Sequence, residues 1–320
     1  MEYLKKLGSE GAKHEFAGPT LTSPTYAGEH ALPYVSAALK SGTTLANNYI
    51  NTLDNVPYKA VMNRVEASGL IADATCDFTD AGAVTLTERI LEVKELQVNL
   101  DLCKKTMRQG WQATQTGNSL NSQLPNEFQD YVIGHVAGLV AESVETSIWN
   151  GAGATAGEFE GFLTATTGHF TTDAGVSDVA LSGVITSSNV VDHLESVMDD
   201  VSSEVMGKSD FALYVNPKTI FLYHQALAAS GFANDYQANG KPSNIYGYNL
   251  LPCHGIPDNN IVATYQSNLN FGSNILTNMT EVKTIDMSDI DGSDNVRFVM
   301  RFACGTQHTV GEDISWGVAS

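Results

Sequence analysis

The chain has 320 residues, of which 42% are apolar and 17% are charged, so it is long enough and apolar enough to fold around a substantial core. Its 36 acidic residues against 17 Lys and Arg give a net charge of −19 at pH 7, which argues against the basic surface of a tight nucleic-acid binder. The sequence has no apolar run of about 18 residues and no signal-peptide pattern, so neither membrane insertion nor secretion is expected.

The first part of the chain is predicted to be an extended arm followed by short helices. Residues 1 to about 30 are rich in Gly, Ser, Thr and Pro, which favours turns and extended backbone. Short helices are expected between Tyr34 and Leu39 and again within 43–53, with a break at Ser41-Gly42.

Residues 60–100 predict a long β-hairpin that leads into a core strand. Apolar and polar side chains alternate here, most clearly at Leu96, Val98 and Leu100, as in a half-buried strand. The stretch Thr79-Asp80-Ala81-Gly82 is the candidate for the turn. Because long polar hairpins are rarely stable alone in water, we expect this one to lean on a partner.

The strongest helix signal begins at Pro125-Asn126 and ends near Trp149. Apolar side chains repeat at three-to-four spacing within it, and Pro is tolerated in a first helical turn. Asn150-Gly151 then ends the helix. At about 1.5 Å per residue the helix is about 35 Å long, which exceeds the mean for globular domains.

The remaining elements predict an α+β fold. A helix is expected over 188–205 and ends at Gly207, and a short apolar strand follows over Phe211–Val215. Asn216 caps a third helix, with Pro217 at its first position. Later strands are expected at 250–251, 261–264, 281–285, 296–303 and 309–316. Helices set against mostly antiparallel strands define the class.

The motifs that could carry chemistry each lack a required neighbour or spacing. The glycines between Gly151 and Gly157 follow a helix and lack the Lys-Ser/Thr of a phosphate-binding loop. The acidic stretch Asp286–Asp294 is interrupted by Met287 and has no Glu at the twelfth position of a calcium loop. A turn between two strands is the favoured interpretation of that stretch.

Cysteine and histidine patterns also fail to predict a site. Cys76, Cys103, Cys253 and Cys304 form no C-x-x-C pair, which favours a reduced context over a disulfide framework. No zinc-ligand spacing occurs, and the adjacent Cys253-His254 pair cannot act as a dyad because neighbouring side chains face apart. We therefore predict no catalytic residue, no cofactor and no metal ligand.

The order of these elements resembles the major capsid proteins of tailed phages, which have the Hong Kong 97 fold. The resemblance covers about residues 60–320 and rests on the sequence of motifs along the chain. The matching segments are the helix end Ile148-Trp-Asn-Gly-Ala-Gly153 with Gly161, the strand–helix junction Tyr214-Val-Asn-Pro217, the segment Gly247–Pro252, and Arg301 in a late strand.

The resemblance implies a division of the chain and a set of assembly residues. The implied parts are an N-terminal arm (1–56), an extended β-hairpin loop (57–93), a peripheral domain (94–185) with a spine helix (126–149), an axial domain (186–279), and returning strands of the peripheral domain (280–320). The implied assembly residues are Thr79, Asp80, Ala81, Gly82 and Arg89 in the hairpin, and Asn150, Gly151, Gly153 and Arg301 elsewhere.

The resemblance also implies a function without catalysis. Such a protein assembles with itself as pentamers and hexamers into an icosahedral shell around phage double-stranded DNA, which it does not bind sequence-specifically. Portal, scaffolding or decoration proteins are the implied partners, and the implied location is the virion after assembly in the host cytoplasm. Three alternatives stay open: an encapsulin-like compartment shell, another phage structural protein such as a tail component, and a cytoplasmic enzyme that uses Cys103 or His254.

Overall fold

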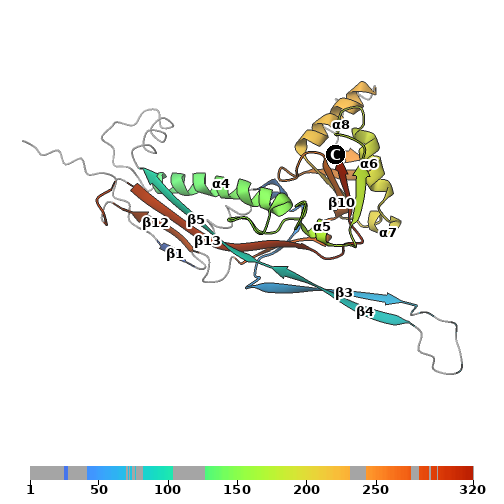
Figure 1. The fold of residues 1–320 in the computed structure, drawn as a ribbon, viewed down its shortest axis with the longest axis horizontal. Helices are drawn as coiled ribbons and strands as arrows, with labels where there is room; N and C mark the ends of the chain where they lie inside the picture. The colour runs from blue at the N-terminus through green and yellow to red at the C-terminus, as the bar shows by residue number, and fades with distance from the viewer. Residues whose placement is uncertain are drawn as a thin grey trace, which may run out of the picture.

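The computed structural model describes residues 25–27, 42–69, 71, 73, 76, 82–103, 127–230, 243–274, 281–287, 290–293 and 295–319. The expected helix between Tyr34 and Leu39 and the expected turn residues Thr79, Asp80 and Ala81 lie outside these ranges. The described chain is elongated, with a long helix and one sheet at one end, a second sheet with shorter helices at the other, and a projecting hairpin (Figure 1).

The first sheet is organised around one long central strand, β13 (Asn295–His308). The first part of β13 pairs antiparallel with β5 (Lys94–Cys103) and β12 (Glu281–Asp286), and its last part pairs with β11 (Leu269–Ser273). The outer strands are β1 (Thr25–Ala27), which pairs with β12, and β2 (Asn51–Leu53), which runs parallel to β11. Side chains alternate between buried and exposed along most of β13, so one face of the sheet is available for packing.

Helix α4 (Glu127–Asn150) packs along that face (Figure 1). Val136, Val140, Val144 and Ile148 contribute its buried stripe, which joins one core with Phe298 and other buried side chains of the first sheet. The short helix α2 (Thr43–Ala46) contacts α4, and α5 (His169–Thr172) follows later in the chain. The sequence prediction of a long amphipathic helix ending at Asn150-Gly151 is confirmed.

The second sheet contains six strands in the order β6-β14-β10-β7-β9-β8. Their bounds are β6 (Ser177–Leu181), β14 (Ser315–Ala319), β10 (Asn260–Tyr265), β7 (Phe211–Val215), β9 (Tyr248–Pro252) and β8 (Asn244–Ile245). Helices α6 (Val190–Asp199) and α8 (Pro217–Ala229) share a second core with this sheet, while α7 (Ser203–Met206) and the 3-10 turn η2 (Gln266–Asn268) are short. The central strand β7 is buried throughout, which explains its unbroken apolar sequence.

Three sequence predictions were wrong in detail. The helix expected over 188–205 is interrupted, because Ser202 accepts a hydrogen bond from the backbone N–H of Val205 and starts α7. The strand expected over 309–316 begins only at Ser315, because the side chain of Asn268 accepts the N–H groups of Thr309 and Val310 and holds a turn. The helix expected within 43–53 covers four residues, after which β2 pairs with β11.

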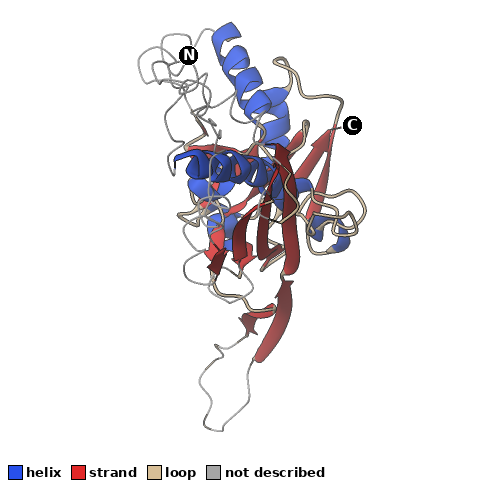
Figure 2. Cartoon of the chain, turned by 90° about the vertical axis from the view of Figure 1, so that its left-hand side faces the viewer, coloured by secondary structure: helices blue, strands red, loops and turns tan. Residues whose placement is uncertain are grey.

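The helix cap predicted at Asn216 is confirmed, because its Oδ1 accepts a hydrogen bond from the N–H of Lys218 at 2.9 Å. The acidic stretch that begins at Asp286 forms the connection between the antiparallel strands β12 and β13, as expected. Figure 2 shows the strands of both sheets from the side, with the hairpin extending beyond them. Within the described residues, no helix combines the length and the apolar character needed to cross a bilayer.

Candidate assembly surface

The projecting hairpin is a two-stranded ribbon made of β3 (Lys59–Ser68) and β4 (Ala83–Glu92). Ten residue pairs join the strands in continuous antiparallel register, from Lys59 opposite Glu92 to Ser68 opposite Ala83. Beyond them, Gly69 and Gly82 have φ values of +66° and +117°, backbone conformations that favour glycine. The strands predicted over 60–100 are therefore confirmed as a hairpin followed by β5.

The two faces of this ribbon differ in exposure. Cross-strand partners point to the same face, so the register assigns every described side chain to one face or the other. One face, here called the apolar face, carries five large apolar side chains that are each more than half exposed: Val61, Val65, Val84, Leu86 and Ile90. The other face, which contains Met62 and Arg89, turns toward the body at its root, where Leu91 is fully buried.

The root of the hairpin is seated on a notch formed by two glycines. Gly272 in β11 and Gly305 in β13 are directly paired, and a β-carbon on either would collide with the hairpin. A β-carbon on Gly305 would lie 3.1 Å from the carbonyl carbon of Glu92 and closer still to its oxygen. A β-carbon on Gly272 would collide with the side-chain end of Leu91. Glycine at both positions therefore allows the hairpin to cross the sheet.

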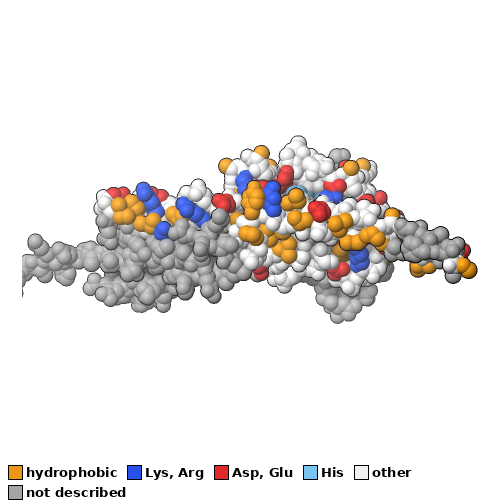
Figure 3. All heavy atoms as spheres, turned by 90° about the horizontal axis from the view of Figure 1, so that it is seen from below, with side chains coloured by type: hydrophobic (Ala, Val, Ile, Leu, Met, Phe, Trp, Pro, Cys, Tyr) orange, Lys and Arg blue, Asp and Glu red, His pale blue; other side chains and the backbone are white. Residues whose placement is uncertain are grey.

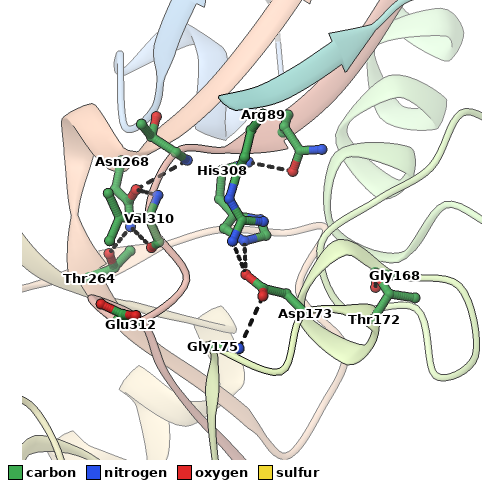
Figure 4. A network of polar contacts seen from close by, with 12 residues as sticks. Arg89, Gly168, Thr172, Asp173, Gly175, Thr264, Asn268, His308, Val310 and Glu312 are labelled. Atoms are coloured by element: carbon green, nitrogen blue, oxygen red, sulfur yellow. Dashed lines mark hydrogen bonds and ion pairs between the residues drawn. The ribbon is translucent and has the colours of Figure 1, made fainter. Parts of the chain in front are cut away.

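A polar network fastens the same root (Figure 4). Arg89 of β4 forms an ion pair with Oδ2 of Asp173, which follows α5. Nε2 of His308, at the end of β13, lies 2.7 Å from the same oxygen, and the N–H of Gly175 donates to Oδ1 at 3.0 Å. A second ion pair joins Arg64 of β3 to Glu312 at 3.4 Å. The network thus connects the hairpin to two distant segments of the body.

The protonation of this network follows from its burial. Burial opposes the charge on Asp173, but the hydrogen bonds from His308 and Gly175 and the charge of Arg89 outweigh it and lower the pKa of the carboxyl. Burial lowers the pKa of His308, and the positive charge of Arg89 lowers it further. The hydrogen bond to Asp173 and the charge of that carboxylate raise this pKa but do not outweigh the other two effects. Asp173 is therefore ionised and His308 neutral at pH 7.

The end of α4 is held by a lysine that lies just after the hairpin. Nζ of Lys94 donates to the carbonyl oxygens of Gly153 at 2.7 Å, Glu158 at 2.6 Å and Thr155 at 3.3 Å. The N–H of Gly161 donates to the carbonyl oxygen of Gly151 at 2.9 Å, so the chain folds back onto the helix end. The glycine-rich segment after α4 is thus fixed to β5, the first strand after the hairpin.

The structure brings together only some of the predicted assembly residues. Asn150, Gly151 and Gly153 lie at the end of α4, next to Lys94 and therefore near the hairpin root. Gly82 ends the described part of β4, and Arg89 lies at its root. Arg301 is exposed on β13, paired with Gln97 of β5 and Glu281 of β12, and belongs to neither group.

The sequence did not predict the residues that position Arg89, which are Asp173 and His308. Asp173 lies 84 residues from Arg89 and 135 from His308, so no local pattern relates the three. Gly272, Gly305 and Lys94 were missed for the same reason, since their partners come from other strands or from a distant turn. The alternation within 60–100 predicted the strands, but the apolar face of the hairpin was not predicted, since the hairpin was expected to be polar.

The enzyme alternative named Cys103 and His254, and both lie at exposed positions, whereas Cys253 beside His254 is buried. Burial raises the pKa of the Cys253 thiol well above its usual range, which disfavours a reactive thiolate. Nδ1 of His254 lies 3.1 Å from Oγ1 of Thr43, whose hydroxyl donates to the buried Glu145 at 2.9 Å. Cys103 is exposed at the end of β5, opposite Asn295. Across the part of the chain that the structure describes, no three His, Cys, Asp or Glu residues gather as a metal site.

On the face shown in Figure 3, acidic and basic side chains are interspersed among apolar ones over the described residues. Lys208, between α7 and β7, pairs with Asp313 at 3.1 Å, and Lys218 of α8 pairs with Asp258 at 2.6 Å. This distribution agrees with the strongly acidic composition and does not form the clustered basic stripe of a nucleic-acid interface.

Comparison with protein-family models found no match, and comparison with curated protein sequences found none. Solved structures match closely in fold and weakly in sequence. A capsid chain of the empty GTA particle aligns with a TM-score of 0.60 and 14% identity, over 88% of this chain and 91% of that one. A chain of the satellite phage P4 procapsid aligns with a TM-score of 0.58 and 12% identity, over 99% and 94%. A chain of Gordonia phage Cozz aligns with a TM-score of 0.56 and 12% identity, over 87% of each chain. This chain therefore has the fold of the major capsid proteins of tailed phages.

Proposed function

We propose that the chain is a major capsid protein, which assembles with copies of itself as pentamers and hexamers into an icosahedral shell around phage double-stranded DNA. In this proposal the hairpin within 57–93 and the arm 1–56 lie over neighbouring copies. The part over 186–279 packs around the five- and six-fold centres, and the remaining parts, 94–185 and 280–320, form the wall between those centres. The subunit does no chemistry of its own.

The observation that carries the proposal is the apolar face of the hairpin. Val65 and Val84 are each 65% exposed, on a ribbon that projects away from the core. A two-stranded ribbon is marginally stable by itself, and large apolar side chains exposed together on one face are typical of surfaces that meet another protein. On this face Asn63 and Glu88 are the polar pair between Val61 with Ile90 and Val65 with Leu86. A second copy is the proposed partner, because closed shells are built by repeating one contact between identical subunits.

Residues at the end of α4 and on β13 have supporting roles in the proposal. Asn150, Gly151 and Gly153 hold the segment that Lys94 fastens beside the hairpin root, so they set where the hairpin leaves the body. Gly82 and the adjoining Thr79, Asp80 and Ala81 are proposed to meet a neighbouring copy. Arg301, exposed on the first sheet, is proposed to contact a neighbour there.

Portal and scaffolding or decoration proteins are proposed as further partners in the virion. The enclosed DNA is proposed to be held without sequence-specific contacts. With a net charge of −19 the subunit repels the phosphate backbone, so packaged DNA does not adhere to the shell.

Expression of the chain, followed by negative-stain microscopy and light scattering, tests the proposal. We expect closed particles of uniform size, with or without an added scaffold. The variant Leu86→Asp places a charge in the middle of the apolar face and should yield subunits that do not close into shells. Its control is Thr85→Asp, which adds the same charge to an exposed neighbour on the opposite face.

Both substitutions are at exposed positions, so both variants should fold. Loss of particles only for Leu86→Asp supports the apolar face as the contact between copies. A wild-type chain that stays monomeric at high concentration, alone and with scaffold, contradicts the proposal. Equal assembly of the two variants contradicts the role of the apolar face.

A further inference from the structure

One carboxylate at the hairpin root is shared by two basic side chains from different elements. Oδ2 of Asp173 accepts the ion pair from Arg89 and also lies 2.7 Å from Nε2 of His308. The two bases differ in access to solvent, since the His308 side chain is 1% exposed and that of Arg89 is 31% exposed. His308 cannot move away from the carboxylate, whereas Arg89 can turn toward water.

A second buried imidazole lies close to the first. The ring centroid of His169, from α5, is 6.4 Å from that of His308, and the ring of Phe170 packs edge-on against His308 at 5.6 Å. Among the described residues, Nδ1 of His308 and Nε2 of His169 have no hydrogen-bond partner. Two other ion pairs of the described root, Arg64 with Glu312 and Lys59 with Glu92, each join opposite charges. Asp173 is therefore the carboxylate that balances the charge of Arg89 and any charge that His308 or His169 gains.

We propose that acid acts as a switch on the hairpin: when His308 gains a proton, it competes with Arg89 for Asp173, and the released Arg89 lets the hairpin root move. At neutral pH the carboxylate is balanced by Arg89 alone. Once His308 is charged, two cations share one oxygen, and the repulsion between them is relieved by the more exposed side chain. Protonation of His169 at lower pH adds a third cation within the same space.

The switch loosens the hairpin without detaching it. Leu91 remains buried in the notch of Gly272 and Gly305, and those contacts do not involve a titratable group. What is lost is the polar clamp on the strand that carries Arg89. The inference rests on the proposed function only in assigning the hairpin to contacts between copies; the switch itself operates within a single chain.

Hydrogen exchange measured by mass spectrometry tests the switch in the full-length chain. The chain carries Leu86→Asp to keep copies apart, a position on the opposite face from Arg89. Exchange is followed at pH 7.5 and pH 5, each normalised to the intrinsic rate at that pH. We expect protection of the amides in β3 and β4 to fall about tenfold at pH 5, the factor expected for loss of one charge-assisted contact. Protection in β7 should stay unchanged, which distinguishes loosening from global unfolding.

Three variants identify the groups responsible. His308→Gln keeps a donor toward Asp173 but cannot gain charge, so its hairpin protection should not depend on pH. Arg89→Gln should have weak amide protection in the hairpin at both pH values. The control Arg64→Gln should lose protection at pH 5 as the parent chain does. An unchanged acid response in His308→Gln overturns the proposal. If that variant does not fold, an acid response in Arg89→Gln as large as that of the parent overturns it equally.

These outcomes are independent of shell formation. A chain that never assembles but shows the acid response contradicts the proposed function and leaves the switch intact. A chain that forms shells but shows no change in hairpin exchange contradicts the switch alone.

Discussion

Replacement of Gly305 by alanine is a direct test of how closely the hairpin root is seated on the first sheet. The added β-carbon would lie 3.1 Å from the carbonyl carbon of Glu92 and 3.2 Å from Cα of Val93. These are backbone atoms, which cannot rotate away as the end of a side chain can, so the root must lift. Overpacking of this kind costs about 1–3 kcal/mol, and the backbone contact puts the expected loss in unfolding free energy at about 2 kcal/mol.

Alanine substitutions at two other glycines provide the comparison for the stability loss expected in Gly305→Ala. In Gly272→Ala the opposing atoms are the methyl groups of Leu91, which can shift, so we expect a loss of about 1 kcal/mol. Gly138 lies on the exposed face of α4, and a β-carbon there meets nothing within 4 Å. Alanine is the better helix former, so Gly138→Ala should stabilise the chain by about 0.5–1 kcal/mol.

Urea unfolding of the three variants in one buffer measures the order of their unfolding free energies. Each carries Leu86→Asp, so that assembly does not contribute to apparent stability. Tryptophan fluorescence is a suitable signal, because Trp149 and Trp316 are both buried. Unfolding of Gly305→Ala at the same urea concentration as the parent would refute the description of the notch. So would a loss in Gly138→Ala as large as that in Gly305→Ala.

Further predictions concern acid stability, the loop after α4 and DNA. Burial and the nearby His308 lower the pKa of His169 to about 4, so its stabilising contribution is complete above about pH 6.5 and is lost as the pH falls toward 4. Urea unfolding at pH 7 and pH 4.5 should reveal a loss of up to about 3 kcal/mol from this group, and a smaller loss in His169→Phe. Lys94→Met removes the donor from three carbonyl oxygens and should cost about 1–3 kcal/mol, with faster hydrogen exchange confined to 151–158; an unchanged exchange rate there would contradict the clamp. In a mobility-shift assay at physiological salt the Leu86→Asp subunit should leave duplex DNA unretarded, and a stable complex would contradict the argument from charge.

The hairpin and the long helix could be predicted because their signals are local. Alternation within 60–100 and three-to-four spacing before Asn150 are properties of neighbouring residues, and the structure has strands and a helix at those positions. The capping of α8 by Asn216 is equally local. These elements also determined the fold class and the resemblance to capsid proteins.

Elements that depend on distant partners could not be predicted. The turn after Thr309 arises because the distant side chain of Asn268 takes over backbone hydrogen bonds. The break before α7 is different: the cap from Ser202 to Val205 is local, and the prediction missed it. Strand β11 was missed because it contains Asn270 and Gly272, which disfavour strands, yet it is buried through pairing with β13. The same limit applies to the root of the hairpin, whose charge partners and glycine notch are assembled only by the fold.

The geometry of the ribbon makes it a lever. Ten paired residues at about 3.3 Å each extend the hairpin by about 33 Å, so a rotation of about 10° at its root moves the far end by about 6 Å. Sub-ångström adjustments at Gly305 or in the spacing between Arg89 and Asp173 are thus magnified several-fold where the hairpin would meet its neighbour. In the proposed shell, identical chains would in this way reach partners at slightly different angles while their cores stay the same, and a few contacts at the pivot would set the curvature.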